Sequence, residues 1–146
     1  MNFDVKCCIH EKYNTDTIDE ITINKIKSTT GILEEIERKE RAEIIFQERL
    51  KLCLNEVAKA KISYGKKINM RVMKLRWGSC TKDGKIILNP ELIAAPKDCI
   101  DYVITHELCH LKEHNHGNKF YELLSYVMPD WNARKEKLNG TVEARG

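Results

Sequence analysis

The chain of 146 residues has no long apolar segment, and this excludes a first class of protein. A helix that spans a bilayer needs about 20 apolar residues in succession, and no stretch of the sequence approaches that length. Charged residues such as Asp4, Lys6 and Lys12 also interrupt any apolar run near the N-terminus, so no export signal is recognisable there. We therefore expect a soluble, cytoplasmic protein that does not enter a membrane.

The sequence also lacks a strong net charge and any Cys-x-x-Cys pair. A formal net charge of +3 is too small to argue for nucleic acid as a partner. Structural zinc sites are usually closed by four cysteine-rich ligands, which argues against one here. Without an export signal, the six cysteines are expected to be reduced thiols. Cys53, Cys99 and Cys109 fall in predicted helices and are expected to be buried.

Length and composition favour one globular domain. A chain of 146 residues with 42% hydrophobic content can form a core of ordinary size, and no internal repeat is present. We expect an N-terminal extension over residues 1–30, a main domain over residues 31–140 and a tail over residues 141–146. The sequence does not determine the oligomeric state, and a monomer is the simplest expectation.

The most informative stretch is His106-Glu107-Leu108-Cys109-His110. Two histidines four residues apart on a helix lie on the same face, so their ring nitrogens can bind one metal ion. Glu107 is then placed beside the open position of the metal, where its carboxylate can accept a proton from water. A helix could also carry two solvent-facing histidines without a metal, but the intervening glutamate favours a catalytic site.

Two residues compete to be the third ligand. His116 follows His110 by six residues, which is the interval of the extended metzincin motif, although Glu113 replaces the glycine of that motif. Asn115 and Gly117 tolerate left-handed backbone conformations that could end the helix and turn His116 back. His114 is the alternative, but three ligands along one straight helix span about 12 Å and cannot all reach one ion.

Hydrophobic periodicity predicts a long helix followed by a small sheet. Residues 32–61 are expected to form a helix whose amphipathic second half backs the sheet. Alternating side chains predict an outgoing strand within residues 68–80. Asp83-Gly84 predicts a tight hairpin turn, and residues 86–88 should form the returning antiparallel strand.

The second half of the chain is predicted to be mostly helical. Asn89-Pro90 should begin a single helical turn, and the helix that carries the histidines is expected over residues 97–114. A further helix should run from about residue 118 to Pro129. Residues 130–138 are predicted to form a last helix that ends at Asn139-Gly140.

Two residues of the outgoing strand are open to more than one interpretation. Trp77 can be a core anchor, and Gly78 can be a bulge where only a missing side chain fits. A glycine bulge beside a metal-binding helix could equally let a peptide approach and pair with the strand edge. We favour the structural role for Trp77 and leave Arg76 and Ser79 undecided.

The N-terminal segment offers a further hypothesis. Alternation over residues 3–9 is typical of a short strand. Cys7, Cys8 and His10 could instead bind a metal, or the segment could fold over the cleft and block it.

Several ordered motifs together resemble one known family. They are Arg-Trp-Gly-Ser-Cys at 76–80, Gly-Lys-Ile-Ile-Leu-Asn at 84–89, Leu-Ile-x-Ala-Pro at 92–96, Ile-Asp-Tyr-Val at 100–103, the histidine motif at 106–110, Asn115-His116, Phe120 and Met-Pro-Asp-Trp at 128–131. The chain resembles the YgjP-like metal-dependent hydrolases over roughly residues 40–139. These are zincins, grouped with the metallopeptidases and more distantly similar to SprT-like proteases. Larger relatives carry a more extensive N-terminal portion.

The resemblance implies a compact α+β zincin-like fold, with zinc bound by His106, His110 and His116 and with Glu107 as the catalytic base. The expected function is a zinc metallopeptidase that acts on a peptide or protein. One alternative directs the same chemistry at a nucleotide phosphoanhydride. Another is a metal-stabilised, SprT-like binding module for nucleic acid, which the nearly balanced charge argues against.

Supporting residues cannot be selected by spacing alone. Asp101 and Glu122 are candidates to orient the imidazoles. The candidates to stabilise an oxyanion are Tyr102, Tyr121, Tyr126, His114 and Arg76.

Overall fold

A computed structural model describes the backbone of residues 20–145 and the side chains of residues 20–141. The strand predicted over residues 3–9, with Cys7, Cys8 and His10, lies outside the described residues. The chain divides into two compact units, residues 1–41 and residues 42–146. No helix among the described residues is long and apolar enough to cross a membrane.

Helix α2 (Glu20–Val57) begins earlier than predicted. Its residues 20–41 belong to the first unit and expose Ile21, Ile32 and Ile36. In the second unit the helix buries residues that recur at helical intervals, which confirms the predicted amphipathic half. These residues are Ala42, Phe46, Leu50, Cys53 and Val57. A short 3-10 helix η1 (Ala58–Ala60) ends the segment close to the predicted boundary.

Within residues 20–145 the sheet has three short strands in the order β1-β3-β2. Strands β2 (Gly78–Cys80) and β3 (Ile86–Leu88) form the predicted antiparallel hairpin. Gly84 in its turn has φ of +80°, a conformation that favours glycine. The outgoing strand is not continuous, because β1 (Asn69–Met70) ends before β2 and pairs with β3 in parallel. The sheet is therefore mixed rather than wholly antiparallel.

Four helical segments follow the sheet. The predicted single turn is η2 (Pro90–Ala94), and the Asn89 side chain caps it by accepting a hydrogen bond from the amide of Glu91. Helix α3 (Lys97–His110) ends earlier than predicted. Helix α4 (Asn118–Val127) agrees with its prediction, but α5 (Trp131–Arg145) continues past Gly140. A glycine costs a helix interior only about 0.5–1 kcal/mol, so it does not by itself end the helix.

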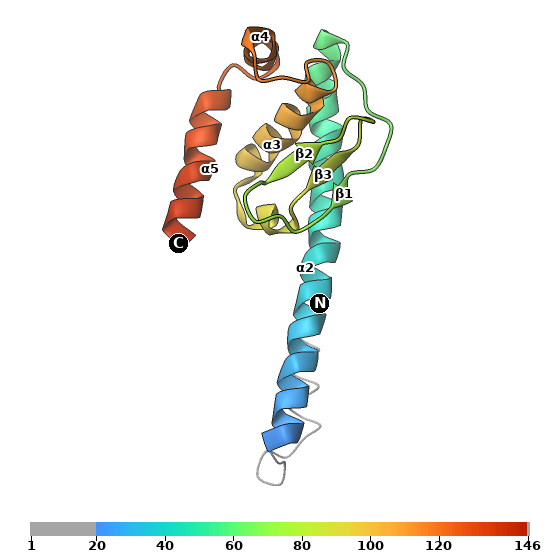
Figure 1. The fold of residues 1–146 in the computed structure, drawn as a ribbon, viewed down its shortest axis with the longest axis vertical. Helices are drawn as coiled ribbons and strands as arrows, with labels where there is room; N and C mark the ends of the chain where they lie inside the picture. The colour runs from blue at the N-terminus through green and yellow to red at the C-terminus, as the bar shows by residue number, and fades with distance from the viewer. Residues whose placement is uncertain (1–19, 146) are drawn as a thin grey trace. The chain divides into compact units, whose positions relative to one another are not determined.

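Helix α3 is the central element of the second unit. It contacts β2 and β3 on one side and α4 and α5 on others (Figure 1). Its Ile104, Leu108 and Cys109 side chains are fully buried. This arrangement confirms an α+β fold and fixes the orientation of the two histidines at the end of α3.

Candidate metal centre

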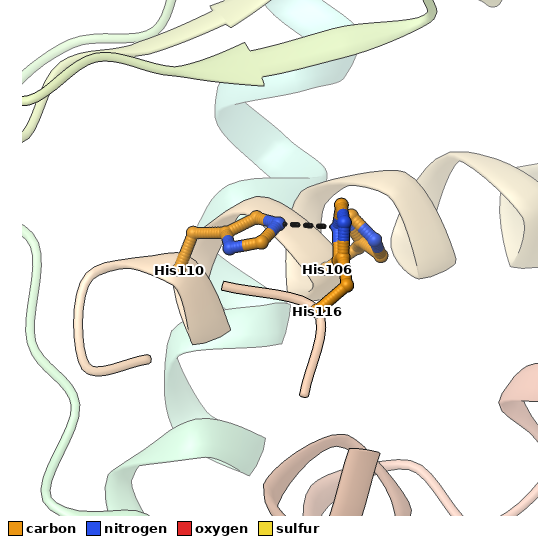
Figure 2. Close-up of side chains that lie close together, drawn as sticks. All are labelled: His106, His110 and His116. Atoms are coloured by element: carbon orange, nitrogen blue, oxygen red, sulfur yellow. Dashed lines mark hydrogen bonds between the residues drawn. The ribbon is translucent and has the colours of Figure 1, made fainter. Parts of the chain in front are cut away.

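Three histidine side chains converge at the end of α3. His106 and His110 project from the last turn of the helix, and His116 approaches from the segment before α4 (Figure 2). One ring nitrogen from each lies within 4.8 Å of the others. His114 lines the same cleft but is not a member of this group. Among the described residues, the structure thus brings together the three histidines that the sequence indicated.

Hydrogen bonding leaves a nitrogen lone pair of His110 facing this cluster. His110 Nδ1 lies 3.0 Å from the carbonyl oxygen of Glu113, and a carbonyl oxygen can only accept a hydrogen bond. The hydrogen of the neutral ring is therefore assigned to Nδ1, so Nε2 carries the lone pair. That Nε2 atom lies 2.8 Å from His116 Nε2. A partner that fixes the tautomer in this way is typical of metal-binding histidines.

The electrostatic environment also suits a metal ion. Burial lowers the pKa of both His110 and His116, which favours the neutral imidazole that binds metals. A tetrahedral zinc ion needs ligand nitrogens roughly 3.3 Å apart, given bonds of about 2.0–2.1 Å. The observed distances lie on either side of this value, since two of the nitrogens are 2.8 Å apart and all three lie within 4.8 Å of one another. Three imidazoles and an open fourth position fit zinc in its catalytic geometry.

Phe120 lies beneath the histidine cluster. Its side chain is fully buried, and its ring stacks on that of His110 with centroids 4.4 Å apart and planes 19° apart. The rings of His106 and His116 meet its edge or face at 4.9 Å and 5.0 Å. In the sequence, Phe120 is one of the family motifs and falls in the helix predicted from about residue 118, but this role was not apparent. An aromatic residue a few positions after the last histidine is the only local sign of it.

Glu107 is held where β2 passes closest to α3. Its side chain is 8% exposed, and one carboxylate oxygen lies 3.3 Å from His106 Nδ1. A Cβ atom added at Gly78 would lie 3.2 Å from Glu107 Cγ and 3.0 Å from Val103 Cγ1. The predicted bulge at Gly78 is wrong, because the pairing from Gly78 to Cys80 is regular. The glycine instead makes room for the glutamate.

A cavity of about 800 Å³ opens over these groups. Strand β2 and the residues beside it form one wall, and Lys135, Leu138 and Asn139 of α5 contribute to the lining. Tyr102 also lines the cavity, and burial raises its pKa to about 12. Its hydroxyl group therefore keeps its proton and can donate a hydrogen bond near neutral pH.

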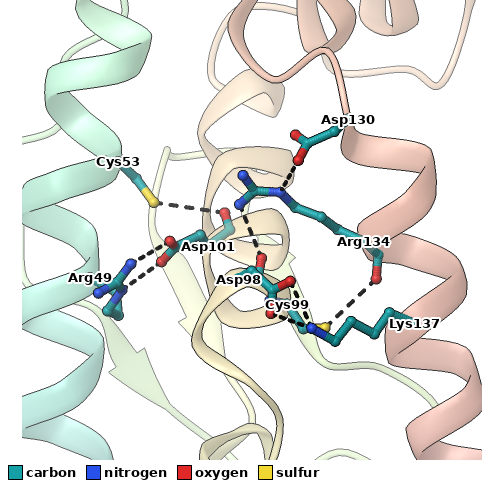
Figure 3. A network of polar contacts seen from close by, with 8 residues as sticks. All are labelled: Arg49, Cys53, Asp98, Cys99, Asp101, Asp130, Arg134 and Lys137. Carbon is teal, nitrogen blue, oxygen red and sulfur yellow. Dashed lines mark hydrogen bonds and ion pairs between the residues drawn. The ribbon is translucent and has the colours of Figure 1, made fainter.

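The predicted supporting residues have mixed outcomes. Asp101 does not contact a histidine; its carboxylate accepts two hydrogen bonds from Arg49 of α2, at 2.7 and 2.5 Å (Figure 3). Glu122 is exposed. Arg76 and His114 line the cavity, whereas Tyr126 lies under the ammonium group of Lys59. Tyr121 lies beside His116, with ring centroids 6.3 Å apart.

The turn after α3 is made differently from the prediction. Neither Asn115 nor Gly117 has a positive φ. The amides of Leu111, Lys112 and Glu113 instead donate to the carbonyl groups of the last helical turn. Because the His110 ring also contacts the Glu113 carbonyl, the histidine itself helps to close the turn.

Polar contacts attach α5 to α3. Lys137 Nζ lies 3.0 Å from Asp98 Oδ2, and the Arg134 guanidinium donates to the Asp98 carbonyl at 3.2 Å (Figure 3). Cys99 adds a thiol contact of 3.7 Å to the Arg134 carbonyl. These contacts position the wall of the cavity that α5 supplies.

Two solved structures share this architecture. The metallopeptidase zymogen abylysin of Pyrococcus abyssi is 19% identical, with a TM-score of 0.58 over 67% of this chain and 95% of that chain. The metallopeptidase zymogen jannalysin of Methanocaldococcus jannaschii is 25% identical, with a TM-score of 0.51 over 64% of this chain and 96% of that chain. No curated protein matches the chain.

The chain thus has the fold of two metallopeptidase zymogens and a group of three histidines that could hold a metal ion. The family model of the YgjP-like metallopeptidase domain matches residues 6–141, so the chain belongs to the YgjP-like family. This confirms the resemblance that the sequence motifs indicated.

Proposed function

We propose that the protein is a zinc-dependent peptidase in which His106, His110 and His116 hold the metal and Glu107 is the general base. The observation that carries this proposal is the convergence of the three rings and the Glu107 carboxylate in one cavity beside a sheet edge. The metallopeptidase neighbours support the reaction class. Residues 31–140 would form the hydrolase domain, with an extension and a tail outside it.

The cavity would bind an extended peptide along the outer edge of β2, which pairs with no other strand among the described residues. The Asn89 amide donates to the Trp77 carbonyl, and the Thr81 amide donates to the Lys85 carbonyl. In this antiparallel pattern, the main-chain groups of Gly78 and Cys80 point away from β3. They can therefore pair with a peptide laid beside the strand, directly over Glu107.

The chemistry needs a base, a metal and a donor for developing negative charge. A bound zinc ion would supply Lewis-acid activation of water and of the substrate carbonyl. The Glu107 carboxylate would take the proton of the attacking water and pass it to the leaving amine. Tyr102, which keeps its proton, is the candidate we favour for donating a hydrogen bond to the oxyanion, with Arg76 and His114 as alternatives.

The test is Glu107→Gln, which keeps the shape of the side chain but removes the base. We expect unchanged zinc content and a loss of peptide hydrolysis of about 10²–10⁴-fold. Glu136→Gln is the matched control: it makes the same substitution at an exposed residue of α5 and should keep full activity.

Two results would contradict the proposal. The first is peptide hydrolysis by a zinc-containing Glu107→Gln protein. The second is hydrolysis of nucleoside triphosphates, measured side by side with peptides, in the absence of any peptide cleavage.

A further inference from the structure

The charged side chains that line the proposed substrate cavity are of one sign, apart from the base itself. Arg76, Lys82 and Lys135 are all cationic, and Glu107 is the only acidic residue among the described residues of the lining. Glu107, which belongs to α3, is buried where this helix meets β2, whereas the three cations are exposed. The charged groups that a substrate meets in this cavity are therefore cations, apart from the catalytic carboxylate.

A second, smaller cavity extends the positive surface. It has a volume of about 360 Å³ and shares Arg76 and Ser79 with the first cavity. Arg71 and Lys74 also line it, and no acidic residue does so among the residues that the structure describes. The positive region thus continues beyond the N-terminal end of β2.

These cations have no partners within the described part of the chain. None of the five cationic side chains that line the two cavities makes an ion pair or a hydrogen bond there. The five residues are Arg71, Lys74, Arg76, Lys82 and Lys135. Several cations elsewhere in the same unit are paired: Arg49 binds Asp101, Arg134 binds Asp130, and Lys137 binds Asp98. As far as the described residues go, the charge around the cavities is not neutralised by the protein.

The positions of the cations relative to β2 indicate how a peptide would use them. Arg76 precedes the strand and Lys82 lies in the hairpin turn that follows it, so the two cations flank the opposite ends of β2. Lys135 lines the cavity from α5 rather than from the strand. A peptide paired with β2 would pass one cation on each side of the Glu107 carboxylate and another on α5.

We propose that the protein prefers acidic peptides, with Asp or Glu side chains on both sides of the cleaved bond, and that Arg76, Lys82 and Lys135 determine this specificity. The proposal rests on the peptidase function and extends it to a substrate class. Arg71 and Lys74 would bind further acidic residues on the side of Arg76.

The same geometry argues against nucleic acid, a polyanion of another class, as the ligand of this cavity. The unpaired amide and carbonyl groups of Gly78 and Cys80 match the main chain of a peptide, which nucleic acid cannot reproduce. The whole chain carries a net charge of only +3, which is small for a nucleic-acid-binding domain.

The experiment compares quenched fluorescent peptides that share one central sequence and differ only in flanks of Glu, Gln or Lys. The zinc-loaded protein is assayed for kcat/KM at low and high salt. An exposed ion pair contributes a factor of about 1.4–5 in affinity, so three together should favour the Glu peptide over the Gln peptide by roughly tenfold. The preference should shrink at high salt because exposed charges are screened.

Charge reversal tests the two lysines among the named residues. Lys135→Glu and Lys82→Glu should each reduce the preference for the Glu peptide and improve cleavage of the Lys peptide. Lys97→Glu is the matched control, since Lys97 is exposed and lines neither cavity. The same labelled peptides are also titrated into Glu107→Gln protein, which reports binding without cleavage.

The outcomes separate the two proposals. Equal kcat/KM for the Glu and Gln peptides would overturn the specificity and leave the peptidase function intact. No cleavage of any peptide, with tighter binding of the Glu peptide to the Glu107→Gln protein, would overturn the peptidase function and retain the preference for acidic peptides. Displacement of the Glu peptide by single-stranded DNA, with Lys135→Glu weakening DNA binding most, would overturn the peptide preference in favour of nucleic acid.

Discussion

His106 and His110 lie on a helix packed in the core, whereas His116 lies on an exposed segment between two helices. The pair on α3 is positioned by helical geometry and by neighbours such as Ile104 and Leu108 that are fully buried. His116 depends on the turn after α3 and on the Phe120 ring. The half of the proposed site on α3 is therefore positioned by the helix that carries it. The other half, His116, is positioned by tertiary contacts.

The largest expected effect is loss of zinc when a histidine of the cluster is removed. His116→Ala should lower zinc affinity by more than about 100-fold, because it removes a direct ligand rather than a supporting group. The free energy of unfolding of the metal-free His116→Ala protein should differ little from that of the wild type, since His116 is exposed. His110→Ala should lose zinc and also destabilise the metal-free protein, because its ring is buried against Phe120.

His114→Ala is the matched control for these variants and should keep its zinc. Metal analysis of each purified protein measures the content, and urea unfolding in the presence of a chelator measures the stability. Zinc lost from His114→Ala but kept by His116→Ala would reverse the assignment of the third ligand.

Phe120 connects the two halves of the site, so its truncation should affect both. Phe120→Ala is expected to lower the free energy of unfolding by about 3–5 kcal/mol, the usual cost of deleting a buried aromatic side chain. Phe120→Leu should cost less and still weaken zinc binding, because the ring that supports the three imidazoles is lost.

Leu124→Ala is the control that distinguishes a loss of protein stability from a loss of the aromatic support beneath the three histidines. Leu124 is fully buried on the same helix, and it has no aromatic ring that could stack against the imidazoles. The Leu124→Ala substitution should lower the free energy of unfolding by about 2–5 kcal/mol, while the folded fraction of the protein keeps normal zinc affinity. Equal zinc affinity in Phe120→Leu and the wild type would show that the phenylalanine is only a core residue.

Gly78 tests the half of the site on α3, where this helix meets β2. Gly78→Ala places a methyl group against Val103 and Glu107, and such overpacking costs about 1–3 kcal/mol. Displacement of the Glu107 carboxylate should lower kcat while zinc content stays at the wild-type level. Gly65→Ala is the control, because no atom lies within 4 Å of its added Cβ. A wild-type kcat in Gly78→Ala would mean that the close approach does not position Glu107.

The smallest effect is expected at the ion pair that attaches α5. Lys137 lowers the pKa of Asp98 from its ordinary value of 3.8, and the Asp98 side chain is 42% exposed. Asp98→Asn should therefore cost less than about 1 kcal/mol. Because the folded pKa is lowered, the stability contributed by the charged form is complete above the ordinary value and is lost as pH falls through the lowered one.

Urea unfolding of wild type and Asp98→Asn at about pH 7 and at about pH 2 measures this effect. The difference in unfolding free energy should be present at the higher pH and absent at the lower. A difference that is equal at both pH values would exclude the ion pair as its cause.

The errors of sequence reasoning have physical causes that can be traced to single elements. Strand β1 pairs in parallel with β3 across an intervening loop, and no local pattern encodes which edge a strand joins. Gly140 does not end α5, because contacts of Arg134 and Lys137 with α3 favour the helix more than one glycine opposes it. Asp101 pairs with Arg49, a residue far away in the sequence that spacing could not identify.

The sequence by itself determined the histidine pair of α3 and the place of Glu107 between them, because helical periodicity converts spacing directly into a shared face. It also determined the hairpin, since Asp83-Gly84 is a local turn signal. Only the tertiary structure decided how His116 meets that pair, why β2 carries a glycine opposite Glu107, and which cations surround the cavity. Those features join different elements of the fold, and their distances depend on how α3, α4, α5 and the sheet pack together.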